Sequence, residues 1–202
     1  MEDLIIATRN PHKTREFARL IGSAFHLRDL ASDAELPEVI ESGASFEENA
    51  RLKALAVSAA LPGLVLADDS GLEVDSLGGA PGIFSARYAG ENASDAQNRQ
   101  KLLHALAQLP PGKRRTARFR CALALARAGE LIAQFKGVVE GEIVERERGA
   151  AGFGYDPVFR PLNREQTFAE MPAEEKDRIS HRGAAVAELL KFLWRSDSAG
   201  NG

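Results

Sequence analysis

The chain has 202 residues, 44% of them hydrophobic and 27% charged, which is the composition of a globular protein that buries a core. Its formal net charge is −3, so we expect no binding to nucleic acid, which needs a basic surface. No apolar run approaches the roughly 18 residues of a membrane span, and the residues before Leu4 lack the basic start of a secretory signal. A single cysteine, Cys121, excludes an internal disulfide framework. We therefore expect a cytoplasmic protein with no membrane partner.

The first part of the chain alternates between strand and helix patterns. Pro11 and Gly22 delimit one helix, and Ser45 with Glu48 has the spacing of a capping box that starts another. The expected elements are a strand at 4–7, a helix at about 13–21, a short extended segment at 39–40, a helix from 45 to about 60, and a buried central strand at 64–67.

Strand patterns dominate the middle of the second part. Ser94 and Gln97 repeat the capping-box spacing, and Ala128-Gly129 is typical of a hairpin turn. The expected elements are a helix from 94 to about 108, strands at 118–125, 131–139 and 142–146, a helix at about 182–194, and a frayed tail at 196–202. This order predicts an α/β fold with a mixed, twisted central sheet flanked by helices.

Polar residues directly follow the first predicted strand. They run Thr8-Arg9-Asn10-Pro11-His12-Lys13 and lead into a helix. The N–H groups and the dipole of a helix N-terminus attract anions, and Lys13 adds a positive charge. No phosphate-binding loop of the G-x-x-x-x-G-K-[ST] type is present. An ordinary connection between a strand and a helix remains the alternative.

Asp68-Asp69-Ser70-Gly71 follows the apolar run at 64–67. Neighbouring carboxylates repel each other unless a cation lies between them, and Mg²⁺ prefers carboxylate oxygens, waters and phosphates. Glu41, which follows the extended segment at 39–40, is a candidate third carboxylate. A simple turn is the alternative, since all four residue types favour turns.

Two further clusters have candidate binding residues. Asn49 and Lys53 lie on one helical face, which points either to phosphates or to solvent. The glycines around Phe153 leave its ring open for stacking on a base, and the donors and acceptors nearby are Asp156, Lys176, His181 and Arg182. An aromatic core residue in a glycine-rich turn is the alternative. The basic run from Lys113 to Arg120 is interpreted as a solvated turn that leads into a strand.

The order of these motifs resembles the noncanonical purine nucleoside triphosphate pyrophosphatases, that is, the dITP/XTP or inosine triphosphate pyrophosphatases of the Ham1-like family. The resemblance extends from Leu4 to Leu193. The matching segments are 7–13, 45–54, 67–75, 78–88, 152–159 and 180–183, among them Ala-Asp-Asp-Ser-Gly-Leu and Ser-His-Arg-Gly.

The resemblance implies a role for each matching residue. Thr8, Arg9, Asn10, Pro11, His12 and Lys13 would bind the triphosphate, and Lys53 would add to the cationic field. Glu41 and Asp69, with Asp68 beside them, would bind Mg²⁺, and Asp69 would accept the proton of the attacking water. Ser70 would touch the substrate. The nucleotide and base site would contain Phe153, Gly154, Tyr155, Asp156, Lys176, His181 and Arg182.

The resemblance also implies an elongated, two-lobed Maf/Ham1-like architecture with a central cleft over residues 1–195, and a homodimer. Water would attack the α-phosphorus of ITP, dITP or XTP, which gives the monophosphate and pyrophosphate. Two departures from the family pattern are His12, at a position that is often glycine, and Ala184, at a position that is commonly polar. The alternatives are a phosphatase that releases inorganic phosphate, a Maf-like pyrophosphatase for modified pyrimidine nucleotides, and a non-enzymatic nucleotide-binding module.

Overall fold

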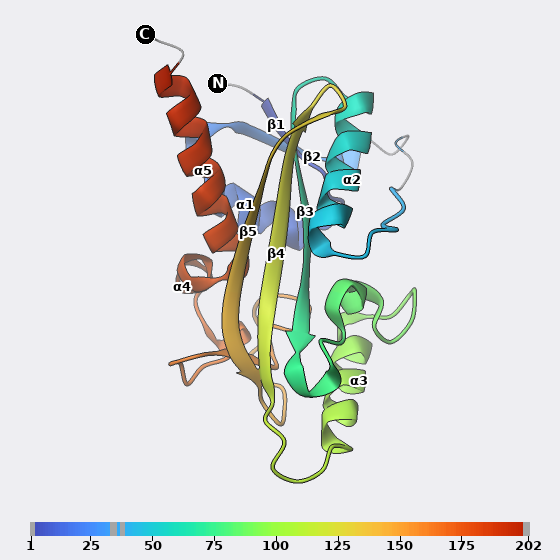
Figure 1. Ribbon diagram of the computed structural model, residues 1–202. Coiled ribbons are helices and arrows are strands. Elements are labelled where there is room, and N and C mark those ends of the chain that lie inside the picture. The colour runs from blue at the N-terminus through green and yellow to red at the C-terminus, as the bar shows by residue number, and fades with distance from the viewer. Residues whose placement is uncertain (1–2, 33–35, 37–38, 200–202) are drawn as a thin grey trace. The chain divides into compact units, whose positions relative to one another are not determined.

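The structure is a computed structural model that describes residues 3–32, 36 and 39–199 (Figure 1). Within these residues a six-stranded sheet has the order β2-β1-β3-β4-β5-β6. The strands are β1 (Asp3–Ile6), β2 (His26–Asp29), β3 (Leu64–Val74), β4 (Thr116–Arg127), β5 (Glu130–Ile143) and β6 (Phe159–Pro161). The α-helices are α1 (Pro11–Ile21), α2 (Phe46–Ala60), α3 (Asp95–Ala107), α4 (Ala173–Ile179) and α5 (His181–Ala199). β1 pairs in parallel with β2 and β3, and β5 pairs antiparallel with β6, so the predicted mixed α/β sheet is confirmed.

Two compact units divide the chain, and three of the strands, β3, β4 and β5, contribute residues to both. The first unit comprises Met1–Asp69, Cys121–Gly137 and His181–Gly202, and the second comprises Ser70–Arg120 and Val138–Ser180. α5 extends beyond the predicted helix at 182–194, and the last residues of the predicted tail, 200–202, lie outside the described residues.

The core of the first unit lies between its strands and two helices. Alternate residues of β1, β3 and β4 point to one face, where α1 and α5 pack against each other and against the sheet. Figure 1 shows α2 on the opposite side of these strands from α5. The fully buried side chains on the α1 and α5 face include Leu4, Phe17, Leu66, Leu123 and Leu189.

Local hydrogen bonds set the ends of the helices. Asn10 Oδ1 accepts from the His12 N–H at 2.8 Å, which caps α1 at its N-terminus, and Gly22 ends this helix at φ 62°. The capping box of α3 is complete, whereas the expected box of α2 is shifted by one residue. Ser45 Oγ accepts from the Glu48 N–H at 3.2 Å, but Glu48 accepts from the Ala44 N–H instead of the Ser45 N–H.

Several predicted elements were wrong or missed. Residues 39–40 belong to no strand, and the expected strand at 142–146 is the end of β5 followed by irregular backbone. The predicted hairpin turn is confirmed, because Ala128 and Gly129 both have positive φ, at 51° and 80°, as a two-residue hairpin requires. β2, β6 and α4 were not predicted, since each is too short to show a clear hydrophobic period.

The second unit has its own core, around three aromatic rings. The ring centroids of Phe119 and Phe159 lie 4.7 Å apart, and those of Phe159 and Phe168 lie 5.2 Å apart. Such contacts between aromatic rings add to the stability that the buried area provides. No helix within the described ranges is long and apolar enough to cross a membrane.

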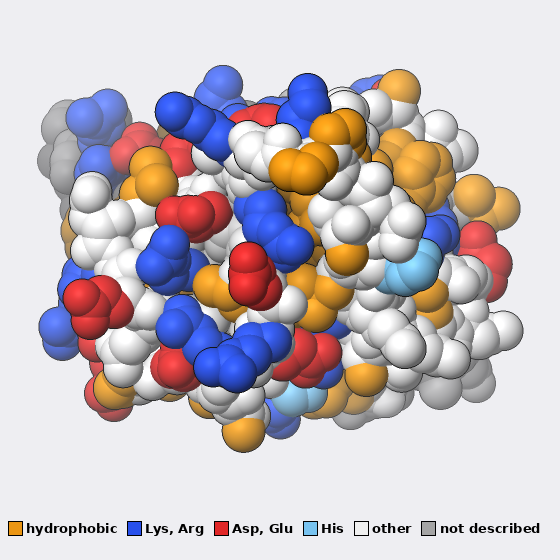
Figure 2. Space-filling view, turned by 90° about the horizontal axis from the view of Figure 1, so that it is seen from below, with side chains coloured by type: hydrophobic (Ala, Val, Ile, Leu, Met, Phe, Trp, Pro, Cys, Tyr) orange, Lys and Arg blue, Asp and Glu red, His pale blue; other side chains and the backbone are white. Residues whose placement is uncertain are grey.

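The basic run at 113–120 starts as exposed, irregular backbone that leads into β4, as predicted, and its last two arginines form ion pairs. Arg118 pairs with Asp75 at 2.9 Å and with Glu140 at 3.0 Å, and Arg120 pairs with Glu73 at 3.2 Å. Only its first residues lie outside a strand, because β4 begins at Thr116. Figure 2 shows blue basic and red acidic side chains next to one another on the face in view.

Candidate functional site

The connection between β1 and α1 is a polar loop that its own hydrogen bonds hold in place. Thr8 Oγ1 accepts from the Asn10 N–H at 3.1 Å, and Arg9 donates to the Leu36 carbonyl at 2.6 Å. His12 lies in the first turn of α1, and the non-glycine residues with positive φ in the described ranges are Ala128 and Asn163. The departure from glycine at position 12 therefore causes no backbone strain.

The segment Asp68-Asp69-Ser70-Gly71 is part of a strand, so the alternative interpretation as a turn is wrong. β3 continues without a break to Val74, because apolar residues before the acidic pair, at 64–67, and after it, at Leu72 and Val74, are buried. Consecutive side chains of a strand point to opposite faces of the sheet. The two neighbouring aspartates consequently have different surroundings.

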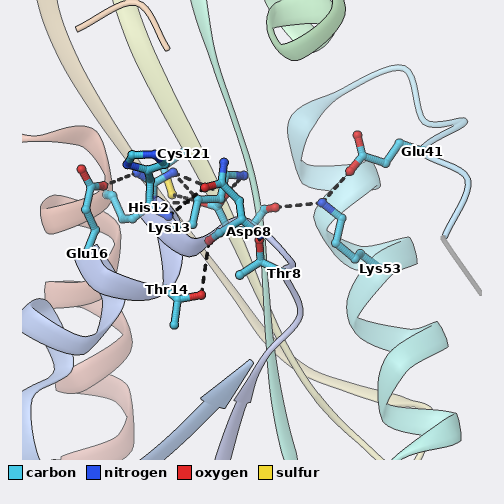
Figure 3. A network of polar contacts seen from close by, with 11 residues as sticks. Thr8, His12, Lys13, Thr14, Glu16, Glu41, Lys53, Asp68 and Cys121 are labelled. Carbon is cyan, nitrogen blue, oxygen red and sulfur yellow. Dashed lines mark hydrogen bonds and ion pairs between the residues drawn. The ribbon is translucent and has the colours of Figure 1, made fainter. Parts of the chain in front are cut away.

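Asp68 is at the centre of a buried network of charged groups (Figure 3). Its carboxylate accepts a hydrogen bond from Lys13 Nζ, from the Arg182 guanidinium at 3.1 Å, and from the Cys121 thiol at 3.2 Å. Arg182, which is 1% exposed, also pairs with Glu16 at 2.5 Å. The two carboxylates raise the pKa of Arg182 against the effect of its burial, so the guanidinium stays charged.

Asp69 is a buried carboxylate that the protein leaves partly unpaired. It is 7% exposed, and neither its Oδ2 nor Nδ2 of the fully buried Asn49 has a hydrogen bond of standard geometry within the described residues, although the Asn49 amide lies close enough to lower the pKa of Asp69. Burial raises the pKa of Asp69 to about 6, and the negative charge of Glu41 adds to this effect, while Lys53 opposes it. A buried acceptor without a donor is costly in a folded protein and is found where a ligand supplies the missing contact.

Lys53 joins Asp68 to Glu41. Its ammonium donates to the Asp68 carbonyl at 3.0 Å and pairs with Glu41 at 2.5 Å, as Figure 3 shows. Lys53 and Asn49 lie one turn apart on α2, so this helical face points to Asp69 and not to solvent. Glu41 reaches this place from irregular backbone and not from the end of a strand.

The three predicted metal ligands do not converge on one point. Within residues 3–32, 36 and 39–199, no three His, Cys, Asp or Glu side chains are grouped as metal ligands. Glu41 and Asp69 nevertheless fit a hard cation, because their charges influence each other and Asp69 Oδ2 has no hydrogen bond. Mg²⁺ needs only one or two carboxylates when waters and phosphates complete its shell. Asp68 is held by Lys13 and Arg182, and its role as a ligand stays a prediction.

The second unit contains the glycine-rich loop around Phe153. Asp156 accepts from the Phe153 N–H at 2.9 Å and from Lys176 Nζ at 2.6 Å, and Lys176 lies 5.2 Å from the centroid of the Phe153 ring. A Cβ at Gly152 would lie 2.0 Å from the Asp156 carboxylate, so only glycine fits there. The aromatic ring is partly exposed, and the interpretation as a core residue does not apply to it.

The remaining predicted residues are divided between the units. Ser70 belongs to the second unit, as do Gly154 and Tyr155, whose hydroxyl donates to the Ser85 carbonyl at 2.8 Å. His181 and Arg182 begin α5 in the first unit, and both are buried. Their assignment to the nucleotide site stays a prediction.

Sequence reasoning missed two partners in the Asp68 network. Glu16 is buried on α1 although the residue type favours solvent, and Cys121 lies on β4 next to β3. The spacing Lys13-x-x-Glu16 puts both side chains on one helical face, which was a usable signal for Glu16. No local signal identifies Cys121, because its contact depends on the pairing of strands that are distant in the sequence.

Comparisons with known proteins agree with the sequence motifs. The model of the Ham1 family matches residues 4–192. The chain is 46% identical to the dITP/XTP pyrophosphatase of Bacillus subtilis, over 96% of this chain and 98% of that protein. It is 49% identical to the dITP/XTP pyrophosphatase of Geobacter sulfurreducens, over 96% and 97%. The solved structure of the Staphylococcus aureus Ham1 protein superposes with a TM-score of 0.84 at 40% identity, over 96% of this chain and all of that chain.

Proposed function

Because the chain belongs to the Ham1 family, we propose that it hydrolyses noncanonical purine nucleoside triphosphates such as ITP, dITP and XTP. The products are the nucleoside monophosphate and pyrophosphate. Two full-length relatives carry the name dITP/XTP pyrophosphatase, which supports this substrate class. The proposal rests mainly on the surroundings of Asp69. One oxygen of this buried carboxylate has no hydrogen bond to a described residue, and the charges of two lysines, Lys53 and Lys13, lower its pKa.

Asp69 is the general base of this reaction. With a pKa of about 6 it is more basic than an ordinary aspartate, yet it remains mostly ionised at neutral pH. It takes a proton from a water molecule, whose oxygen forms a bond to the α-phosphorus. The bond from the α-phosphorus to the bridging oxygen breaks, and pyrophosphate leaves with its electron pair.

The cations around Asp69 balance the charge of the substrate. A nucleoside triphosphate carries about four negative charges, and fixed positive groups stabilise the additional charge of the transition state. Two of these positive groups are the ammonium groups of Lys13, on α1, and Lys53, on α2. The β1–α1 loop adds N–H groups at the N-terminus of α1, next to the N-cap residue Asn10.

Glu41 and Asp69 are the residues that would hold Mg²⁺. When bound, Mg²⁺ screens the phosphate charge and lowers the pKa of a bound water. Lys53 contacts Glu41 at 2.5 Å, so this ammonium already supplies positive charge at the carboxylate. Chelation with EDTA is expected to abolish turnover, and added Mg²⁺ is expected to restore it.

Selection of the base rests on donors in the second unit. Hypoxanthine and xanthine have a 6-keto acceptor where adenine has an amino donor. The buried Lys176 ammonium donates to Asp156, and it lies 5.2 Å from the centroid of the Phe153 ring, where a stacked base would meet it. A buried donor left without an acceptor disfavours adenine, so ATP should be a poor substrate.

The proposal also includes the cellular location and the oligomeric state of the protein. The chain acts in the cytoplasm, which agrees with its single buried thiol, Cys121. It works as a homodimer, as the resemblance to the family implies. Sedimentation at several protein concentrations tests the second statement.

Product analysis with ITP, XTP, GTP and ATP tests the proposed reaction. Monophosphate and pyrophosphate from ITP and XTP are expected, with slow cleavage of ATP. Release of inorganic phosphate would instead indicate a phosphatase, and activity confined to modified pyrimidine nucleotides would indicate a Maf-like enzyme. If no nucleotide is hydrolysed, the protein would instead be a non-enzymatic nucleotide-binding module.

Asp69→Asn tests the assigned base. The variant is expected to lower kcat by about 10²- to 10⁴-fold, the usual contribution of a general base. Asp75→Asn is the matched control, because Asp75 follows the same strand but is exposed and pairs with Arg118. Near wild-type turnover of Asp69→Asn would show that another group takes the proton.

A further inference from the structure

A cavity with charged walls lies within the second unit, apart from the residues assigned to the proposed reaction. Its volume is about 470 Å³, inside the range of about 300–1,000 Å³ that small-molecule sites have. Its charged lining residues are Arg115, Arg146, Arg148, Arg160, Glu142 and Glu145. Arginines therefore outnumber acidic residues in this lining.

Backbone hydrogen bonds hold the arginine-bearing segments together. The Arg115 carbonyl accepts from the Ile143 N–H at 2.8 Å, and the Arg148 N–H donates to the Pro157 carbonyl at 2.9 Å. Arg160 lies on β6 opposite Glu142 of β5. Arg115, Arg148 and Arg160 thus stand on paired backbone, and Arg146 lies in a bend between the paired residues Val144 and Arg148, so binding an anion requires little reordering of the backbone.

The four guanidinium groups differ in their partners. Arg160 pairs with Glu142 at 2.8 Å, and Arg148 lies 3.5 Å from Glu170. Among the described residues, the Arg115 guanidinium donates only to the Val144 carbonyl, at 3.3 Å. The Arg146 side chain is exposed and has neither a hydrogen bond nor an ion pair in the described part of the chain. Two guanidiniums at the cavity therefore lack an acidic partner.

We propose that this cavity binds a small phosphate-bearing anion through Arg115 and Arg146. A guanidinium forms two parallel hydrogen bonds to a phosphate group, which is why arginine is common at phosphate sites. Glu142 and Glu145 interrupt the positive lining, which disfavours a long polyanion such as nucleic acid. The occupant is consequently a compact ligand, either inorganic pyrophosphate or a nucleotide. This site does not depend on the proposed reaction.

Titration calorimetry with pyrophosphate, with a matched pair of variants, tests the site. Arg146→Glu and Arg114→Glu change the net charge equally, and both side chains are exposed and have no partner in the described ranges. Arg114 does not line the cavity. Arg146→Glu is expected to weaken one class of pyrophosphate binding by at least about tenfold, the loss of one hydrogen-bonded charge contact. Arg114→Glu is expected to bind as the wild type does.

The same titration with IMP separates the two ligand sources. A loss confined to pyrophosphate assigns an inorganic diphosphate site, and a loss for IMP as well assigns a nucleotide site. Turnover of ITP should be equal in both variants, because neither arginine belongs to the proposed catalytic residues. Equal binding of pyrophosphate by Arg146→Glu and Arg114→Glu, or a single class of site that neither variant changes, would overturn the proposal.

Discussion

Replacing Asp69 with asparagine is expected to stabilise the metal-free protein while it removes the proposed base. Burial raises the pKa of Asp69 from 3.8 to about 6. A carboxyl group whose pKa is raised on folding stabilises the protein fully below its unfolded pKa, and this stability is lost as the pH rises through the folded pKa. Asparagine is neutral at every pH, so the Asp69→Asn variant does not lose this stability as the pH rises.

The magnitude follows from the two pKa values. Linkage gives Asp69→Asn an advantage of about 1.5 kcal/mol at pH 5 and about 3 kcal/mol at pH 8 in the free energy of unfolding. Urea denaturation in EDTA at both pH values measures this difference. EDTA is needed because a cation bound to Asp69 would favour the charged carboxylate.

The control is a variant at an aspartate whose pKa is lowered in the folded protein, so that the expected change in stability has the opposite sign. Hydrogen bonds from Thr116 and from Arg118 lower the pKa of the exposed Asp75, so Asp75→Asn is expected to lose a little stability at pH 8. The reasoning is refuted if Asp69→Asn is less stable than the wild type at pH 8, or if its advantage does not grow between pH 5 and pH 8. Either result would mean that Asp69 is well solvated or paired in the folded protein.

Four further substitutions, one of them a control, test other parts of the structure. Arg182→Met leaves the Asp68 and Glu16 carboxylates without this buried cation and should cost about 3–5 kcal/mol in urea unfolding; a loss below about 1 kcal/mol would contradict the network. Gly137→Ala places a Cβ 2.0 Å from the His181 carbonyl and should cost about 1–3 kcal/mol in thermal unfolding. Gly78→Ala, at φ 65° with open space around it, should cost about 1 kcal/mol and is its control. Lys53→Met removes a charge that lowers the pKa of Asp69, so the acid limb of kcat/KM should move to higher pH; an unchanged profile would separate Lys53 from the base.

Features that depend on neighbours within a few residues were predictable from the sequence. Pro11 and Gly22 bound α1, as predicted, because each acts on the backbone of its own turn. The Ala128-Gly129 turn followed from the same local logic, since few residue pairs accept positive φ in succession. The order of the motifs identified the family, which the match over residues 4–192 confirms.

Only the tertiary structure shows how the surroundings of the two neighbouring aspartates differ. The residues at 68–71 favour turns locally, but burial on both sides of the sheet and pairing with neighbouring strands keep them in β3. Because consecutive side chains of a strand point to opposite faces of the sheet, Asp68 lies on the face of Arg182. Asp69 lies on the other face, near Asn49 of α2. The pKa of a carboxyl group depends on its burial and on charges from distant parts of the chain. The family resemblance already pointed to Asp69 as the base, and the fold supplies the physical difference, because Asp68 is paired with Arg182 whereas Asp69 Oδ2 has no hydrogen bond to a described residue.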